Sequence, residues 1–122
     1  MTAGAINHLE TLRKREDFLR VQAAPRVGCE TLVLHMLPNP SLPEGRARVG
    51  FTVTKRCGGA VERNRIKRRL RALACSMLVK KGHPGTDYVL IGKPGTGHAP
   101  YDTLKRDLKY ALHRIHKPKD PA

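Results

Sequence analysis

A long amphipathic helix places the strongest constraint on what this chain can fold into. After Cys57-Gly58-Gly59 the apolar residues take up helical spacing and form one stripe that ends near Gly82, a natural residue to follow a helix end. The stripe consists of Ile66, Leu70, Leu73, Ala74 and Met77. A helix of about five turns with one apolar face needs a second layer to cover it. The rest of the chain must therefore supply a sheet or further helices.

Segments with strand character stand on both sides of this helix. Residues 31–37 and 46–54 are rich in β-branched and apolar residues, and the turn-forming sequence PNPSLPEG between them predicts a hairpin with a long loop. Residues 87–92 lie between two breaks that contain glycine and proline, and they predict a short buried strand.

Two further helices complete the predicted order. Residues 11–24 predict a first helix that Pro25 stops, and residues 101–116 predict a last helix with one apolar face. The sequence thus predicts a single domain over residues 1–122, of the α+β or α/β class, with one small central sheet of about four strands and three helices against it. The predicted order is helix, three strands, helix, strand, helix, with an ordered core of about residues 11–116 and flexible ends.

The chain carries far more positive charge than an ordinary small enzyme. It has 24 Lys and Arg against 10 Asp and Glu, a formal net charge of +14. Such an excess indicates a polyanionic partner: nucleic acid, an anionic membrane or an acidic protein. No apolar run approaches the roughly 20 residues of a membrane span, and no apolar signal core stands at the start, so we expect a cytoplasmic protein. The three cysteines are far apart and predict free thiols.

Half of the net charge lies in residues 54–71, which hold eight basic residues and one acidic residue, a net +7. The residues opposite the apolar stripe of the helix are Asn64, Arg65, Arg68 and Arg71, flanked by Lys67 and Arg69. Arg63 falls near the stripe, so either the helix begins close to it or that end overhangs the core. Like charges recur at four-residue spacing without acidic partners, which destabilises an isolated helix. The pattern favours nucleic acid as the external anion, because guanidinium groups match phosphate oxygens.

The strand predicted at 46–54 has two different faces. Val49, Phe51 and Val53 alternate with Arg48, Gly50, Thr52 and Thr54, so one face suits the core and the other could face a ligand. Aromatic residues make up only 4% of the chain, too few to stack every base of a bound single strand. Phosphate contacts should therefore dominate the binding of nucleic acid.

These features together resemble the protein subunit of bacterial ribonuclease P. The resemblance is carried by Lys55-Arg56, Ala60-Val61, Arg63-Asn64-Arg65, Lys67-Arg68 and Arg71, with further matches at Arg15 to Phe18, Arg48 to Thr54, Asp87 to Ile91 and Lys93 to Gly95. In that family the catalytic subunit is an RNA, and the protein helps to remove the 5′ leader from precursor tRNA. The resemblance also implies an α+β fold built as a compact α/β sandwich, with a left-handed strand-helix-strand crossover, against the usual rule.

The resemblance assigns residues to two surfaces. The residues implied to bind the RNA subunit are Lys55, Arg56, Arg63, Asn64, Arg65, Lys67, Arg68 and Arg71. Those implied to line a cleft for the single-stranded leader are Phe18, Gln22, His35, Arg48, Thr52 and Thr54. Gln22 and His35 depart from the family, which commonly has aromatic residues there. His35 stands two residues from both Val33 and Leu37, so the three side chains lie on one face of the predicted strand. We predict that this face is also the face of Thr52.

The expected partners are the ribonuclease P RNA and precursor tRNA, with no membrane and no small-molecule substrate. No nucleophile, base and orienting group stand together, so we expect no catalytic residue in the protein. We expect Mg²⁺ to be held by the RNA and the substrate rather than by the protein.

Several alternative interpretations remain. Phe18 could instead be a plain core residue, and His113 with His116 could suggest a metal pair but lack a third ligand. A ribosomal or rRNA-assembly protein and a membrane-surface helix remain as alternatives.

Overall fold

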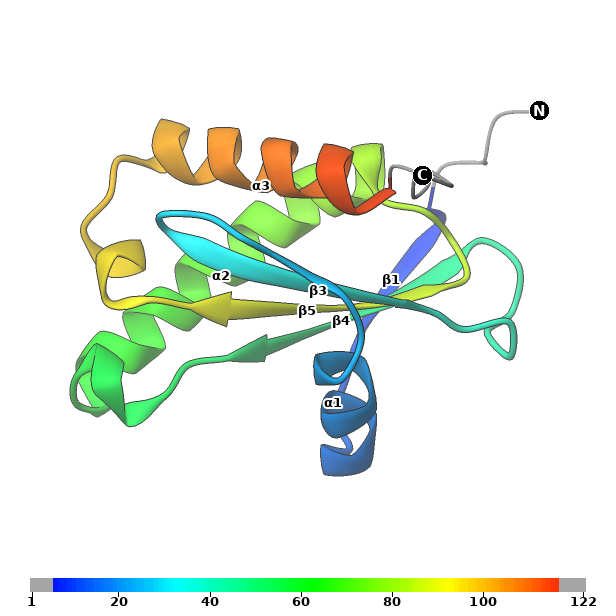
Figure 1. Ribbon diagram of the computed structural model, residues 1–122, viewed down its shortest axis with the longest axis horizontal. Helices are drawn as coiled ribbons and strands as arrows, with labels where there is room; N and C mark the ends of the chain where they lie inside the picture. The colour runs from blue at the N-terminus through cyan, green and yellow to red at the C-terminus, as the bar shows by residue number, and fades with distance from the viewer. Residues whose placement is uncertain (1–5, 117–122) are drawn as a thin grey trace, which may run out of the picture.

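The computed structural model describes residues 6–116, which form a five-stranded mixed sheet with helices on both faces (Figure 1). The elements are β1 (His8–Thr11), α1 (Arg15–Gln22), β2 (Arg26–Gly28), β3 (Leu32–Pro38), β4 (Arg46–Thr52), α2 (Ala60–Lys81), β5 (Thr86–Gly92) and α3 (Tyr101–His116), with short 3-10 helices η1 (Lys55–Cys57) and η2 (Pro94–Gly97). The α+β class and the three helices agree with the prediction. No helix in this part of the chain is long and apolar enough to cross a membrane.

The strand order across the sheet is β1-β4-β5-β3-β2. β5 runs parallel to β4 and antiparallel to β3, so it separates the two strands that the sequence predicts to form a hairpin. That prediction is wrong. Turn-forming residues between β3 and β4 show only that the chain reverses its direction. The long connection allows β5, a strand buried along most of its length, to take the place between them and pair on both sides.

Two strands were not predicted individually, and both lie at the edges of the sheet. β1 pairs only with β4, and β2, three residues long, pairs only with β3. Short edge strands contain polar, exposed residues and show little alternation of apolar and polar residues, so sequence patterns do not identify them. β1 begins at His8, before residue 11, where the predicted core begins. The predicted flexible tail after residue 116 lies outside the described residues.

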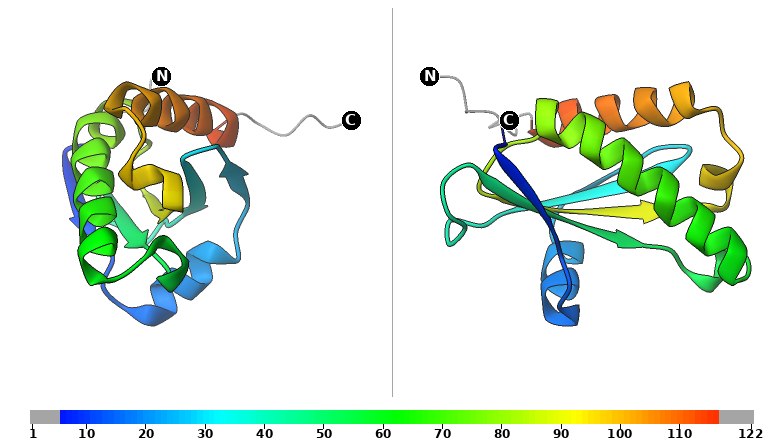
Figure 2. Two further views of the ribbon diagram at one scale, coloured as in Figure 1. Left: turned by 90° about the vertical axis from the view of Figure 1, so that its left-hand side faces the viewer. Right: turned by 180° about the vertical axis from the view of Figure 1, so that it is seen from behind.

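The β4-α2-β5 crossover is left-handed. Figure 2 (right) shows α2 in front of the sheet with β4 and β5 both pointing right and β5 above β4. With the strands turned to point upward, the second strand lies to the left of the first, the opposite of the common arrangement. The feature that the family resemblance implied is therefore present.

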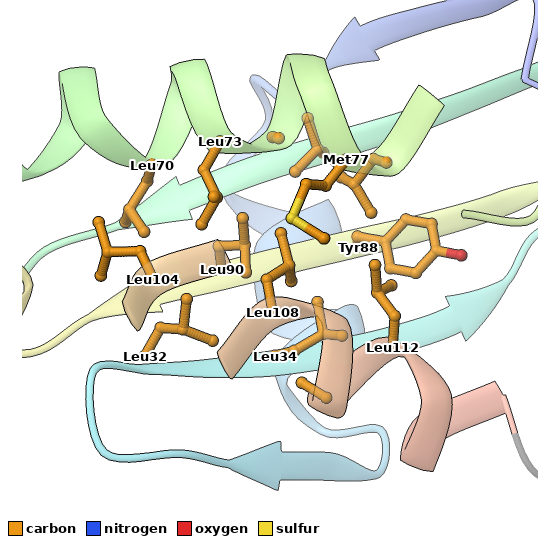
Figure 3. Close-up of a cluster of buried hydrophobic side chains, with 14 of the residues drawn as sticks. Leu32, Leu34, Leu70, Leu73, Met77, Tyr88, Leu90, Leu104, Leu108 and Leu112 are labelled. Atoms are coloured by element: carbon orange, nitrogen blue, oxygen red, sulfur yellow. The ribbon is translucent and has the colours of Figure 1, made fainter. Parts of the chain in front are cut away.

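The main core lies between the sheet and the layer formed by α2 and α3 (Figure 3). All five residues of the predicted stripe on α2 are buried. They meet leucines from β3, β5 and α3, of which Leu34, Leu90 and Leu108 have no exposed surface. Each fully buried leucine contributes about 1.5–3 kcal/mol of hydrophobic stabilisation. This cluster anchors α2 by one face and leaves its opposite face in solvent.

Gly82 ends α2 for a reason other than the predicted one. Its φ of −80° is not left-handed, so glycine is not needed there for backbone conformation. A Cβ at this position would lie 2.6 Å from the carbonyl oxygen of Leu78 and 2.9 Å from Cδ1 of Ile6. Glycine is required because the chain passes close to the last turn of the helix.

The other face of the sheet carries only α1, which stands against β3 and β5 (Figures 1 and 2). A smaller apolar cluster lies beneath it, formed by Leu12, Val21 and Val89, with Phe18 partly buried against them. The helix begins at Arg15 rather than at residue 11, because Leu12 directly follows β1 and donates its N–H across the sheet edge to the carbonyl oxygen of Val49 at 2.9 Å.

Candidate nucleic-acid interface

The first half of α2 presents a basic surface at the end of the sheet where β4 and β5 finish (Figure 1). We define the basic surface by Lys55, Arg56, Arg63, Asn64, Arg65, Lys67, Arg68 and Arg71. All of these are exposed except Arg63, which is half-buried. The helix begins at Ala60, so Arg63 lies in its first turn, and the expectation that the helix starts close to Arg63 is confirmed.

The cations of the basic surface have few partners within the protein. Within residues 6–116 none of them forms an ion pair. Arg63 makes one long contact, from Nε to the carbonyl oxygen of Gly59 at 3.5 Å, and the guanidinium of Arg71 lies 5.8 Å from the centre of the Phe51 ring. The helix start has no side-chain cap. The surface is therefore a set of like charges without internal compensation.

Arg69 differs from its neighbours. Its Nη1 donates to the carbonyl oxygen of Thr96 at 2.8 Å, and its Nη2 donates to that of Ala99 at 2.5 Å. These bonds tie α2 to η2 and to the segment that leads into α3. Arg69 therefore serves the fold, whereas Arg65 and Arg68 remain free to bind an external anion.

An open cleft of about 700 Å³ lies on the α1 side of the sheet. Its walls are Gln22, Ala23, Ala24, Pro25, Arg26, His35, Thr52, Thr54 and Ile91. The structure thus brings together four of the six residues that the resemblance assigned to a leader cleft, and His35 does share the face of Thr52, as predicted. Gln22 Nε2 donates to Thr52 Oγ1 at 3.2 Å, which joins the end of α1 to β4.

His35 is a neutral group in this cleft. Its Nδ1 lies 3.1 Å from the carbonyl oxygen of Ala24, and because a carbonyl only accepts, Nδ1 carries the proton. Burial lowers the pKa of His35, and the positive charge of Arg26 lowers it further, although the hydrogen bond to Ala24 acts in the opposite direction. The imidazole therefore offers hydrogen bonding rather than charge near pH 7.

Arg26 was missed by the sequence reasoning. It is exposed, it lines the cleft, and it pairs across strands with His35. The signal was weak because β2 has only three residues and follows a proline. Its presence gives the cleft one cation next to a neutral imidazole.

Phe18 lies outside the lining of the cleft, one turn before Gln22 on α1. Its ring packs over Gly50 so closely that a Cβ on that glycine would lie 2.5 Å from Phe18 Cε1. The ring is partly buried against the smaller apolar cluster and partly exposed. Gly50 therefore sets how near α1 can approach the sheet.

Arg48 is engaged within the protein. Its Nε and Nη2 donate to the two carboxylate oxygens of Asp87, each at 2.8 Å, and its Nη1 donates to Asp17 at 3.3 Å. The Asp87 side chain has no exposed surface and also accepts from Asn39 and Arg20, both at 3.0 Å. This network joins α1, β4 and β5, and no pattern in the sequence revealed it.

The charge of Asp87 is maintained by these partners. Burial alone would raise its pKa, but the hydrogen bonds from Arg48 and Asn39 and the positive charges of Arg48 and Arg20 outweigh burial and lower the pKa below the usual value. Asp87 is thus ionised at neutral pH and neutralises the arginines around it.

Comparison with known proteins gives one consistent family. The family model described as Ribonuclease P matches residues 6–116. The chain is 44% identical over 116 residues to the ribonuclease P protein component of Ruegeria pomeroyi, with 94% of this chain and 93% of the relative covered. It is 45% identical over 103 residues to that of Caulobacter vibrioides, with 84% and 68% covered.

Solved structures show the same fold. The RNase P protein of Staphylococcus aureus superposes with a TM-score of 0.73 at 22% identity, covering 87% of this chain and 94% of that one. The RNase P protein from Thermotoga maritima gives a TM-score of 0.70 at 27% identity, with 88% and 99% covered.

Proposed function

The chain belongs to the ribonuclease P protein family, and from this premise we propose that its basic surface binds the RNA subunit and that its cleft holds the 5′ leader of precursor tRNA. As a protein component of ribonuclease P it is a subunit of an endoribonuclease that contains RNA. The alternative of a ribosome-assembly protein is not favoured by these relatives. Because precursor tRNA is the substrate in this proposal, the place of action would be the cytoplasm.

The observation that carries the proposal is the row of uncompensated cations on α2. Arg65 and Arg68 follow one another at three-residue spacing on an exposed helix face whose other side is locked into the core. A rigid row of guanidinium groups can follow a phosphate backbone, and each phosphate that it neutralises releases condensed counterions. The binding would screen repulsion between RNA segments and so favour the folded RNA at ordinary salt.

The cleft would hold the leader by means other than extensive stacking. Its polar groups are the amide of Gln22, the hydroxyls of Thr52 and Thr54 and the imidazole of His35, with Arg26 as its cation. Stacking contributes about 1–3 kcal/mol per base, and Phe18 is the aromatic residue nearest to this region on α1. In this proposal hydrogen bonds and one charge take the place of the aromatic stacking that Gln22 and His35 do not provide.

Hydrolysis in this proposal belongs to the RNA, with Mg²⁺ held by the RNA and the substrate. On the α1 side, the carboxylates of Asp17 and Asp87 bind arginines. Within residues 6–116 no group of three His, Cys, Asp or Glu residues stands close enough to hold a metal. In this proposal the protein contributes affinity and charge, and the metal supplies activated water on the RNA.

Reconstitution tests the proposal. The full-length protein is added to ribonuclease P RNA and precursor tRNA at low Mg²⁺, and cleavage at the mature 5′ end is measured. We expect the protein to restore cleavage that the RNA alone does not perform under these conditions. Cleavage that stays absent, while the RNA alone is active at high Mg²⁺, would refute the proposal.

The leader cleft has its own test in Phe18→Ala. We expect this variant to weaken binding of precursor tRNA about 5- to 150-fold while mature tRNA binds as before, because a leader base that extends past the cleft would lose its stacking on the partly exposed Phe18 ring. Leu19→Ala is the matched control, because Leu19 lies on the same helix and is 54% exposed. An equal loss for both tRNAs would show that Phe18 acts only through the fold.

A further inference from the structure

A second positively charged groove lies at the other end of α2, where this helix and α3 both finish (Figure 1). It has a volume of about 760 Å³ and carries three cationic side chains: Lys81 from α2, and Arg106 and Lys109 from α3. The remaining lining residues are His83, Tyr110, Leu112, His113 and His116. None of the residues that the resemblance assigned to RNA lies in this groove, which we call the α2–α3 groove.

Stability of the fold accounts for only one of these three cations. A basic residue in the last turn of a helix interacts favourably with the helix dipole and so stabilises the helix, which explains why Lys81 is basic. Arg106 and Lys109 lie before the last turn of α3, where the effect of the dipole has faded. Arg106 is 69% exposed, and its Nε lies 3.8 Å from a carboxylate oxygen of Asp107, too weak a contact to fix it. In the described part of the chain, Lys81 and Lys109 form no ion pair.

The carboxylate of Asp107 is itself occupied elsewhere. Its Oδ2 accepts from the backbone N–H of Thr31 at 3.1 Å and from the Thr31 hydroxyl at 2.7 Å. The side chain is mostly buried and ties α3 to the segment before β3. Within residues 6–116, the positive charge of the α2–α3 groove is therefore left without an effective partner, as on the basic surface.

A neutral stretch of helix separates the α2–α3 groove from the basic surface. The exposed residues of α2 between Arg71 and Lys80 include no charged side chain; they are Ala72, Cys75, Ser76 and Val79. With a rise of 1.5 Å per residue, Arg71 and Lys81 stand about 15 Å apart along the axis. Two distinct patches of cations thus occur on one helix layer, and the proposed leader cleft lies across the sheet from both (Figure 2).

We propose that the α2–α3 groove binds the phosphate backbone of a second segment of the RNA subunit. This inference rests on the proposed function, because it takes the RNA subunit to lie along α2. A long RNA that contacts the start of α2 can continue along the same layer, whereas a leader held on the α1 side cannot. Three cations converge on the groove, and the 51% exposed ring of Tyr110 gives a flat apolar wall for a ribose or base beside the phosphates.

The test removes two of these charges in the full-length protein, as Lys81→Ala with Lys109→Ala, and measures binding to ribonuclease P RNA at several salt concentrations. We expect the slope of log K against log salt to decrease in magnitude by about 1.5. Hydroxyl-radical footprinting is expected to lose one protected RNA segment, different from the segment lost with Arg65→Ala and Arg68→Ala. The matched control, Arg13→Ala with Lys105→Ala, removes two exposed charges outside both surfaces.

A salt slope and a footprint equal to those of the control would overturn the α2–α3 groove as an RNA site. Weaker binding of precursor tRNA, with binding of the RNA subunit unchanged, would overturn the assignment to the RNA subunit. If the unaltered protein failed to bind the RNA subunit at all, both the proposed function and this inference would fall. If it binds and the groove variant behaves like the control, only the inference falls.

Discussion

The two faces of the sheet use arginine in opposite ways. On the α1 face, Arg48 and Arg20 both donate to Asp87, a carboxylate with no exposed surface. On the other side, Arg65 and Arg68 of α2 stand in solvent, and in the described part of the chain no carboxylate pairs with them. The same residue type is thus neutralised inside the protein on one face and left unneutralised on the other.

This difference separates two means of binding RNA. A paired arginine has given its donors to a carboxylate and cannot also hold a phosphate without breaking that pair. In the proposed function, the α1 face would therefore recognise RNA by shape, by neutral hydrogen-bonding groups such as Gln22 and Thr52, and by the single cation Arg26. The α2 face would gain affinity mainly from charge, which acts on any phosphate and depends strongly on salt.

The largest effect is expected on the α2 face, where the charge is left unneutralised. Arg65→Ala with Arg68→Ala should weaken binding of ribonuclease P RNA about 100-fold or more, because each charge-assisted hydrogen bond contributes about 1.5–3 kcal/mol. The salt slope of binding should flatten by about 1.5. Filter binding over a range of salt concentrations measures both, with Arg13→Ala and Lys105→Ala as the control. An unchanged slope would mean that these arginines do not contact phosphates, and the contrast between the faces would lose its basis.

The second-largest effect is expected when the paired charge of Asp87 on the α1 face is removed. Asp87→Asn should lower the free energy of unfolding by about 2–4 kcal/mol, because it leaves Arg48 without its main partner in a partly buried place. Because the pKa of Asp87 is lowered in the fold, its contribution is present above the unfolded pKa of about 4 and is lost as the pH falls toward the folded pKa. Urea unfolding at pH 7 and below pH 4 measures this.

The control for Asp87→Asn is a double-mutant cycle with Arg48→Gln. Removal of both partners should cost less than the sum of the single changes, because neither charge is then left alone. Additive effects would show that the two side chains are not coupled. RNA-subunit binding should stay unchanged in the folded variants, since the basic surface lies on the other side of the sheet.

The two faces also differ in how far the sequence predicts them. The stripe on α2 is local, because residues three and four apart share one helix face, and all of its members proved to be buried. The exposed basic surface follows directly from that stripe. The α1 face is instead assembled from distant segments. Arg48 and Asp87 are neighbours only because β4 and β5 pair in one register after a long crossover, which no local pattern encodes.

The cleft shows the same limit. Gln22, His35 and Thr52 come from α1, β3 and β4, and only the family resemblance placed them together before the structure did. Arg26 was missed because the pairing of β2 with β3 brings it to the cleft, not a motif of its own. The predicted hairpin was wrong for a related reason, since sheet order depends on which strands most need burial. Local periodicity does not contain that information.

A third prediction tests the contrast between the α1 face and the α2 face, and it concerns the contact between α1 and the sheet. Gly50→Ala should destabilise the fold by about 1–3 kcal/mol, because the new Cβ would lie 2.5 Å from the Phe18 ring and push α1 outward. Precursor tRNA should bind more weakly, and the RNA subunit as before. Gly28→Ala is the control, since no atom lies within 4 Å of a Cβ placed there. If Gly50→Ala weakened RNA-subunit binding as much as precursor binding, the two faces would not be independent.

The smallest effect concerns one basic residue on the α2–α3 side that is not a cation. His116 stacks on His83 with ring centres 3.6 Å apart, and its Nε2 lies 2.7 Å from the Tyr88 hydroxyl. Burial, and then the charge of His83, lower the pKa of His116 to about 4. The unfolded chain takes up this proton near pH 6.5, so the free energy of unfolding should fall as the pH drops from about 6.5 to 4.

His116→Gln should therefore flatten the pH dependence of stability between pH 6.5 and 4, while glutamine can still bond to Tyr88. Thermal unfolding of both proteins at half-unit pH steps measures the difference. A neutral His116 adds no charge to the lysines and arginines of this side, whose own charge does not change in this range. If the two pH profiles coincided, His116 would be protonated in the fold as readily as in the unfolded chain. The α2–α3 side would then carry a pH-dependent charge that the α1 face, with its ionised Asp87, does not.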